Sequence, residues 1–168
     1  MKKLIMIIGF FLFTAHAFAG IRVNESAPLF SLKDLEGNNF NLADVVGATR
    51  KEHVQGVIVS FFASWCQPCR NELPLINSLT DELKGKGIKI IIVNVKEDEK
   101  TIKALLADLK VNKPLVLSDR NGKISEKYGV LFLPVTFFVG ADGNVKSVIY
   151  GEIENKKKLM DSADKIAK

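Results

Sequence analysis

The sequence predicts an α/β domain in which a mixed central sheet is covered by helices on both faces. Two observations carry this prediction. Two apolar runs, residues 57–62 and 88–95, are each followed by a segment with helical spacing, and a hairpin pattern occupies residues 134–151. Short apolar runs are typical of strands buried on both faces, and strands that alternate with helices are typical of parallel sheets. The length of 168 residues and the 47% apolar composition fit one domain.

The first expected element is a β-hairpin that begins near Ala27. Apolar and polar residues alternate from Phe30 to Leu35, a turn follows at residues 36–39, and the pattern resumes from Phe40 to Leu42. A polar loop, Gly47 to Gly56, then leads into the first buried strand.

The middle of the chain repeats the order strand, then helix. Apolar side chains recur at helical spacing from Cys66 to Leu83, and the segment Lys84 to Gly87 ends this helix. Pro74 is expected to kink it, because proline removes a backbone hydrogen bond. A second amphipathic helix spans Glu99 to Lys110.

The last third predicts smaller elements. A short strand at Pro114–Leu117 precedes a short helix at Lys123–Tyr128. Two strands then flank an Asp-Gly turn within residues 141–144, which is strong evidence for a hairpin. Apolar residues gather on one side of a final helix from Ile153 to Ala167.

The N-terminus has the order of a secretory signal peptide. Residues 1–19 hold two lysines, an apolar run at 4–13 and small residues up to Ala19. A spanning helix needs roughly 20 apolar residues, so we predict cleavage after Ala19, export to the periplasm and a mature domain of residues 20–168. An uncleaved membrane anchor and cleavage after Ala17 remain alternatives.

The net charge of the chain does not indicate a particular class of binding partner. The whole chain has 24 Lys and Arg against 19 Asp and Glu, and removing the two lysines of the signal leaves a net charge of +3. Basic and acidic residues are interleaved, and the run Lys156 to Lys158 lies in a mixed helix. The sequence therefore predicts no nucleic-acid surface.

The two cysteines, Cys66 and Cys69, stand where a buried strand passes into a helix. A disulfide between these cysteines would stabilise the fold only weakly. Closing a four-residue loop contributes about 2 kcal/mol to the free energy of unfolding, against about 4.7 kcal/mol for a hundred-residue loop. The start of a helix favours a thiolate at Cys66. We therefore predict a redox-active disulfide, with Cys66 as the nucleophile and Cys69 as the resolving cysteine.

The surrounding residues resemble a known family. The motif WCQPC after an apolar strand, Pro74 in the helix, and Leu133-Pro134 before the penultimate strand resemble the thioredoxin fold. APLFSLKDLEGNNFNL, SFFASWCQPCRNELP, VNV and YGVLFLPVTFFVGADGNV are similar to the exported TlpA/ResA-like thiol-disulfide oxidoreductases, from about Ala27 onward. This resemblance implies a thioredoxin-like fold with an N-terminal hairpin and an inserted helix-strand unit at residues 96–117.

The resemblance also assigns roles near the cysteines. Trp65 is expected to shield the disulfide and shape a substrate-binding surface while also packing in the core. Gln67 and Pro68, between the cysteines, help to set the redox poise and complete that surface.

Glu72 lies one helical turn after Cys69 and is expected to relay a proton to or from it. Without the resemblance, an acid on a helix is more often a surface residue. Thioredoxin has a buried aspartate six residues before its first cysteine, and Ser60 stands there in this chain. The displaced acid supports Glu72 as the proton carrier.

Pro134 matches the family's cis-proline, which faces the disulfide and leaves the backbone of Leu133 free to pair with substrate. Leu131, Phe132 and Leu133 make this approach apolar. A docking rim and a core-facing strand entry are equally compatible with that pattern.

The resulting hypothesis is an exported protein disulfide reductase. The family includes cytochrome c maturation reductases, so apocytochrome c is a candidate among disulfide-containing exported substrates. The chain has no second cysteine pair and therefore needs an external donor, a membrane thiol-transfer protein of the kind this family uses. No metal, flavin or nucleotide cofactor is expected, since no phosphate-binding motif occurs.

Three other classes of protein compete with this hypothesis. A copper-binding redoxin-like module would need a ligand besides the two thiolates, and only His53 remains outside the signal. A peroxidase of the peroxiredoxin kind has no WCxxC pair, whereas this chain has one at residues 65–69, so the sequence does not match that class. A non-catalytic binding domain stays open, because fold does not guarantee activity.

Overall fold

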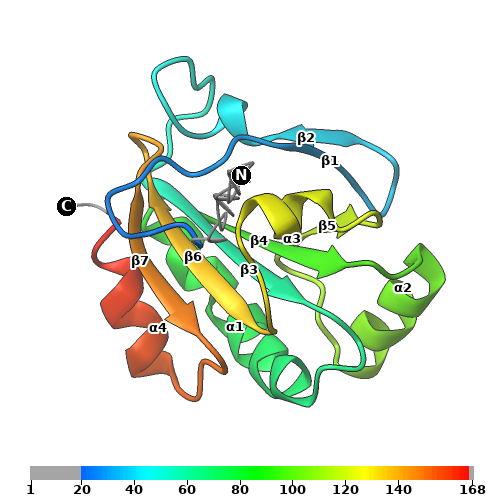
Figure 1. The fold of residues 1–168 in the computed structure, drawn as a ribbon. Coiled ribbons are helices and arrows are strands. Elements are labelled where there is room, and N and C mark those ends of the chain that lie inside the picture. The colour runs from blue at the N-terminus through cyan, green and yellow to red at the C-terminus, as the bar shows by residue number, and fades with distance from the viewer. Residues whose placement is uncertain (1–19, 167–168) are drawn as a thin grey trace, which may run out of the picture.

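Within residues 20–166, which the computed structural model describes, seven strands form one mixed sheet in the order β2-β1-β5-β4-β3-β6-β7 (Figure 1). The strands are β1 (Ser31–Asp34), β2 (Asn39–Asn41), β3 (Gly56–Phe62), β4 (Ile88–Val95), β5 (Leu115–Asp119), β6 (Val135–Gly140) and β7 (Val145–Tyr150). The helices are η1 (Leu42–Asp44), α1 (Gln67–Gly85), α2 (Glu99–Asp108), α3 (Lys123–Lys127) and α4 (Lys156–Ala163). The predicted signal peptide lies outside the described residues.

The centre of the sheet is parallel and its flanks are antiparallel. β3 pairs with β4 and β4 with β5 in parallel, whereas β6 pairs antiparallel with β3, and β7 with β6. This arrangement follows from the connections, because α1 and α2 cross over between parallel strands and a tight turn joins β6 to β7. The predicted mixed sheet is confirmed.

The predicted N-terminal hairpin is present as β1 and β2. β1 also pairs antiparallel with β5, so the strand of the inserted unit joins the hairpin to the parallel centre. Leu42, expected on the second strand, instead begins η1. The side chain of Asn41 caps that turn by accepting the N–H of Ala43 at 3.2 Å, which ends the strand.

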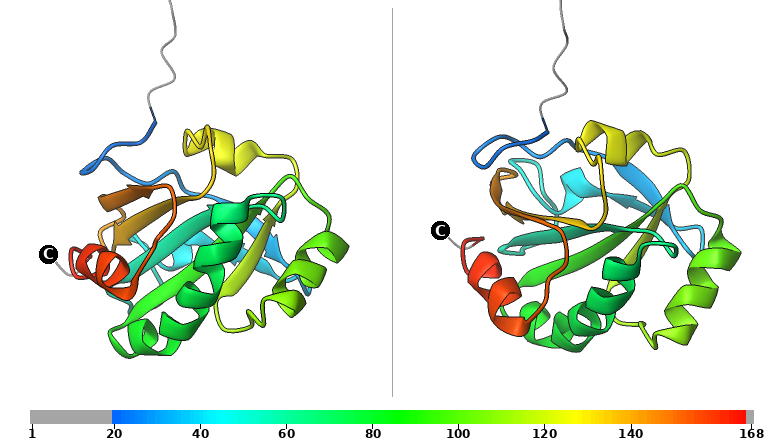
Figure 2. Two further views of the ribbon diagram at one scale, coloured as in Figure 1. Left: turned by 90° about the horizontal axis from the view of Figure 1, so that it is seen from below. Right: turned by 60° about the horizontal axis from the view of Figure 1, so that its bottom comes forward.

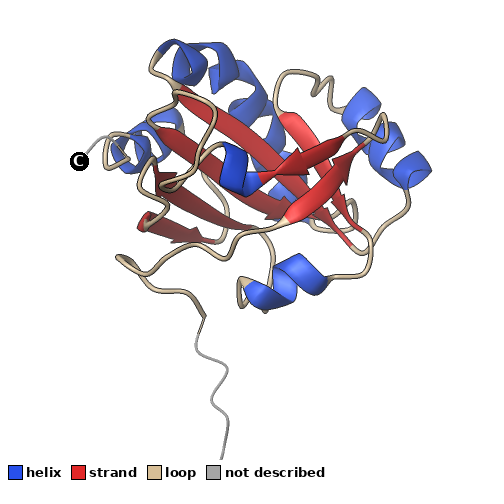
Figure 3. Cartoon of the chain, turned by 90° about the horizontal axis from the view of Figure 1, so that it is seen from above, coloured by secondary structure: helices blue, strands red, loops and turns tan. Residues whose placement is uncertain are grey.

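Helices cover both faces of the sheet, as predicted. Figure 2 shows α1, α2 and α4 on one face, while α3 and the N-terminal segment lie against the other. Figure 3 shows the twist of the strands between these layers. The strand side chains alternate accordingly: Ile58, Ile90 and Ile92 face α1, whereas Val59 and Ile91 face α3.

The helices differ in extent from the prediction, and α2 and α3 end at Asp108 and Lys127, slightly earlier than expected. α1 begins with Cys66 as its N-cap and continues through Pro74 to Gly85. α4 is shorter than expected, because Ile153 is buried in the preceding loop and Asn155 caps the helix by accepting the N–H of Lys158 at 3.0 Å. Among residues 20–166, no helix combines the length and apolar composition needed to cross a bilayer.

Candidate active site

The cysteine pair forms a disulfide at the point where β3 passes into α1. Cys66 and Cys69 are bonded, with their Cα atoms 5.3 Å apart. The Sγ of Cys66 accepts the backbone N–H of Cys69 at 3.2 Å, as an N-cap side chain does. The same N–H and the positive end of the helix would stabilise a thiolate at Cys66 after reduction.

The two sulfurs differ in access. Cys66 is 4% exposed and Cys69 is completely buried, and both belong to the core on the α1 face. An incoming thiolate can therefore reach the disulfide only at the Cys66 side. This asymmetry supports the predicted division into a nucleophile and a resolving cysteine.

Glu72 is the one acid on α1 that is buried, with 1% of its surface exposed. Its Oε2 accepts the backbone N–H of Ile153 at 2.8 Å, and its Oε1 accepts the hydroxyl of Ser60 at 3.2 Å. Ser60 in turn accepts the hydroxyl of Thr136 at 2.9 Å. The carboxyl group is thus held from β3, β6 and the loop before α4, and the surface-helix alternative for Glu72 is wrong.

Burial governs the protonation of Glu72. Loss of hydration raises the pKa of its carboxyl group to about 7, although the hydrogen bonds from Ile153 and Ser60 oppose this rise. Nearby Glu152 raises the pKa further, and Lys158 lowers it. A carboxyl group with this pKa can accept or release a proton near neutral pH, one helical turn from Cys69.

A second glutamate supports the loop on the other side of the cysteines. Glu97 follows β4, and its carboxylate accepts the backbone N–H of Ser64 at 2.7 Å and the Ser64 hydroxyl. It also accepts the side-chain amide of Asn94 at 2.7 Å. These bonds fix the backbone two residues before Cys66, and with it the direction of Trp65.

Leu133 packs against the core cluster that contains both cysteines, and Pro134 immediately precedes Val135, the residue of β6 that pairs with Phe61 near the end of β3. Gln67 and Pro68 are exposed, Leu133 is partly buried and Pro134 is buried. The Leu133–Pro134 peptide bond is cis, as the resemblance implied. Trp65 is 73% exposed, so the expectation that it packs in the core is wrong.

Sequence reasoning missed the partners that hold the two acids. The sequence pattern indicates Ser60 only as the replacement of an aspartate and Ile153 only as an apolar residue of the last helix, and it indicates no role for Thr136 or Glu97. The position of Ser60, on the same strand face as Ile58 and six residues before Cys66, is the signal that could have identified it as a partner of an acid.

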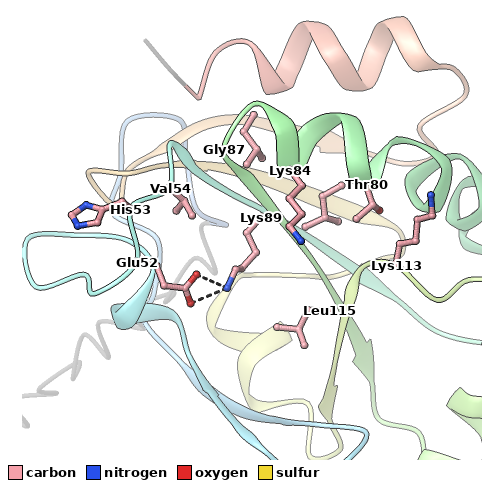
Figure 4. A pocket seen from close by; sticks show the side chains of 11 residues that line it. Glu52, His53, Val54, Thr80, Lys84, Gly87, Lys89, Lys113 and Leu115 are labelled. Atoms are coloured by element: carbon pink, nitrogen blue, oxygen red, sulfur yellow. Dashed lines mark hydrogen bonds and ion pairs between the residues drawn. The ribbon is translucent and has the colours of Figure 1, made fainter.

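A separate hollow of about 550 Å³ lies at the opposite end of the sheet (Figure 4). Glu52 and Lys89 form an ion pair at 2.6 Å on its wall, and His53 stands at its edge with its ring turned away. All of β3 separates His53 from Cys66, a distance of roughly 20 Å. His53 therefore cannot complete a copper site with the two thiolates.

Known proteins resemble this chain over most of its length. The model of the AhpC/TSA family matches residues 23–148. Thiol-disulfide oxidoreductase ResA of Bacillus thuringiensis subsp. konkukian (strain 97-27) is 33% identical over 146 residues, covering 87% of this chain and 79% of that protein. ResA of Bacillus subtilis (strain 168) is 32% identical over 151 residues, covering 88% and 79%.

Solved structures agree with the sequence relatives. A thiol:disulfide interchange protein of the thioredoxin family from Chlorobium tepidum TLS superposes with a TM-score of 0.70 at 26% identity, covering 89% of this chain and 100% of that chain. StoA from Bacillus subtilis has a TM-score of 0.63 at 21% identity over 79% of this chain and 96% of its own. The predicted thioredoxin-like fold is confirmed.

Proposed function

This chain belongs to the AhpC/TSA family and is a thiol-disulfide oxidoreductase, and we propose that it works outside the cytoplasm as a reductant of selected protein disulfides. One observation carries the direction: Glu72 is buried one helical turn from Cys69. A carboxylate in a dry site disfavours a nearby thiolate, so it destabilises the reduced protein. A pair whose reduced form is destabilised gives up its electrons more readily.

The reaction begins with the reduced protein. The Cys66 thiolate attacks one sulfur of a substrate disulfide, forms a bond to it, and expels the other substrate sulfur as a thiolate that takes a proton from water. The substrate is now joined to Cys66 by a mixed disulfide. Because Cys69 is buried, its thiol is shielded from solvent bases at this stage.

Glu72 enables the second step. Its carboxylate takes the proton of the Cys69 thiol, and the resulting thiolate attacks the Sγ of Cys66. The Cys66–Cys69 disulfide forms, and the second substrate sulfur leaves as a thiol after protonation. Two electrons have passed to the substrate, and the protein is left in the oxidised state described here.

Another dithiol must then reduce the protein. One thiolate of the donor attacks Cys66, Cys69 leaves, and Glu72 returns a proton to it. The donor's second thiolate then attacks its own sulfur in the mixed disulfide, so that Cys66 leaves as a thiolate and the donor is left with a disulfide. We propose a membrane thiol-transfer protein as this donor, and apocytochrome c as one candidate substrate among exported proteins. Export itself rests on the signal pattern of residues 1–19.

The reduction potential of the Cys66–Cys69 pair tests the direction. We expect a value more negative than about −200 mV, in the range of reducing thioredoxin-like proteins. The purified protein should also reduce insulin in the presence of a dithiol, with Cys66→Ser as the inactive control. A potential near about −120 mV, typical of a strong oxidant, would overturn the proposal.

Trapping identifies the substrates. Cys69→Ser cannot resolve the mixed disulfide, so partners should remain attached to Cys66 when this variant is produced in the native host. Recovery of apocytochrome c would support the maturation role. Recovery of only other exported proteins would contradict the proposed role in cytochrome c maturation.

A further inference from the structure

The three lysines at the start of α4 have different partners, although the sequence groups them as one charged run. Lys156 pairs with a glutamate of α1, and Lys157 pairs with an aspartate of α4 itself. The ammonium group of Lys158 instead donates to the backbone carbonyl of Glu152 at 2.8 Å, in the loop between β7 and α4. It also lies 3.9 Å from the exposed carboxylate of Glu154. Lys158 is therefore the lysine of this run whose charge is directed at the loop.

The carbonyl that Lys158 holds belongs to the same peptide group as the N–H that binds Glu72. The Glu152–Ile153 peptide is trans and planar, so its C=O and its N–H point in opposite directions. The ammonium group lies at the carbonyl end, and the Oε2 of Glu72 accepts the N–H at 2.8 Å at the other end. One peptide group therefore links a partly exposed cation to the buried carboxyl group.

Other contacts hold this loop in place. The N–H of Gly151 donates to the carbonyl of Pro134 at 2.9 Å, and Ile153 is 1% exposed. The carboxylate of Glu152 accepts the side-chain amide of Asn71, on α1, at 3.2 Å. Among these contacts and the one with α4, only the contact with α4 brings a positive charge to the peptide group.

The charged groups around Glu72 act in opposite directions. β3 and β6 present the hydroxyls of Ser60 and Thr136, and the cysteine pair is bonded in this state, so none of these adds a charge. Burial raises the pKa of Glu72 most, Glu152 raises it further, and Lys158 lowers it. Lys158 is thus the cation that opposes the cost of charging this carboxyl group.

We propose that Lys158 is a positioning residue for Glu72: it holds the Glu152–Ile153 peptide group with its N–H directed at the carboxylate, and its charge strengthens that hydrogen bond. This inference rests on the proposed function, in which Glu72 takes the proton of Cys69. An N–H whose own carbonyl is bonded to a cation is more strongly polarised, because hydrogen bonds in a chain reinforce one another. It therefore stabilises the charged carboxylate better than an isolated amide does, and more molecules have Glu72 ready to accept a proton at neutral pH.

The titration of Glu72 in the oxidised protein tests this role without any cysteine chemistry. The amide signal of Ile153 in NMR spectra should follow the charge of the carboxyl group that it binds, with a midpoint at about pH 7 in the wild-type protein. Lys158→Met keeps the apolar part of the side chain and removes the cation. We expect it to raise the midpoint by about half to one pH unit. An unchanged midpoint would overturn the proposal.

Matched variants separate the contact with the peptide group from a general effect of charge. Lys157→Met removes the neighbouring cation, whose partner is on α4, and should leave the midpoint unchanged. A rise equal to that in Lys158→Met would refute the role of the peptide group. Lys158→Arg keeps a cation and should retain most of the wild-type behaviour, whereas Glu152→Gln removes the opposing charge and should lower the midpoint. The N-cap of α4 binds the backbone N–H of residue 158, so these variants keep the start of the helix.

The rate of the resolving step separates this inference from the proposed function. At pH 6, Lys158→Met should form the Cys66–Cys69 disulfide from the mixed disulfide about three- to ninefold more slowly than the wild-type protein, because fewer molecules carry a charged Glu72. At pH 9 the two rates should agree within about twofold. A midpoint that moves while the pH dependence of this rate does not would support the contact of Lys158 and refute Glu72 as the proton carrier. Rates that differ by the same factor at both pH values would indicate a structural defect and overturn the proposal.

Discussion

Two glutamates flank the loop that carries the disulfide, and their surroundings differ. Glu72 on α1 is 1% exposed and accepts two hydrogen bonds, one from a hydroxyl and one from a backbone N–H. Glu97, after β4, is only partly buried and accepts three, including the backbone N–H of Ser64. The first carboxyl group lies in the apolar core, and the second lies at its margin.

This difference shows how the surroundings of a glutamate side chain determine what it does. Few donors and little water keep the cost of the Glu72 charge high, so its proton is exchanged near neutral pH. Glu97 is satisfied by groups of the loop that it supports, which suits a residue that positions Ser64. We therefore expect Glu72 to govern proton transfer and Glu97 to govern the shape of the loop.

The largest effect is expected on the rate of the resolving step. In Glu72→Gln the Cys69 thiol loses its base, so formation of the Cys66–Cys69 disulfide from the mixed disulfide should slow by about a hundred- to a thousandfold at pH 8. In the wild-type protein this rate should rise with pH through about 7, the pKa of Glu72. Trp65, the single tryptophan, provides a stopped-flow fluorescence signal.

Glu97→Gln is the matched control for this rate. It removes one charge on the other side of the same loop, so the rise of the rate near pH 7 should persist. If Glu72→Gln retains that rise, Glu72 is not the group that accepts the proton. If Glu97→Gln abolishes it, Glu97 takes part in the proton transfer and does not only support the loop.

The next largest effect is on stability. The folded protein binds the Glu72 proton more tightly than the unfolded chain does, since the pKa rises from 4.5 to about 7. This contribution is fully present below about pH 4.5 and is lost as the pH rises through 7, which amounts to about 3 kcal/mol. Glu72→Gln should abolish the loss and raise the free energy of unfolding at pH 8 by up to that amount.

Urea unfolding of the oxidised protein at pH 5 and pH 8 measures this effect. The interval avoids the acid range in which Asp34, Asp98 and Asp142 take up protons, because the pKa values of these three groups are lowered. A wild-type protein equally stable at both pH values, with Glu72→Gln no more stable at pH 8, would contradict a raised pKa.

The sequence predicted the features that depend on local pattern. The runs that form β3 and β4 are mostly apolar, as is typical of strands buried on both faces, and the Asp-Gly turn located β6 and β7. The cysteine pair was placed correctly at the start of a helix. The cis bond at Pro134 was implied by the family resemblance, since the base rate for cis proline is only about 5 to 6%.

The surroundings of the site depend on contacts between distant segments. Glu72 is buried because the loop at Ile153, 81 residues later, closes over it. Ser60 and Thr136 meet only through the register of β3 and β6. The outward direction of Trp65 likewise follows from a loop whose support, Glu97, lies in the segment after β4. No local periodicity encodes these contacts.

A smaller effect is expected when the loop loses its support. In Glu97→Ala the Ser64 N–H and the Asn94 amide lose their acceptor, which should cost about 1 to 2 kcal/mol because water can replace part of it. Hydrogen exchange at the Ser64 amide should also become faster. Glu99→Ala, at an exposed acid in the first turn of α2, is the control and should leave that exchange rate unchanged.

The smallest effect comes from the hydroxyl that donates to Glu72. The bond from Ser60 stabilises the charged carboxylate and lowers its pKa, so Ser60→Ala should move the rise of the resolving rate to higher pH, with a change in rate below tenfold at pH 7. Thr136→Val is the matched control. The Thr136 hydroxyl reaches Ser60 rather than the carboxylate, so its removal should shift the profile less. A shift to lower pH in Ser60→Ala would mean that the hydroxyl stabilises the protonated acid, and the direction of proton flow between Glu72 and Cys69 would need to be reassigned.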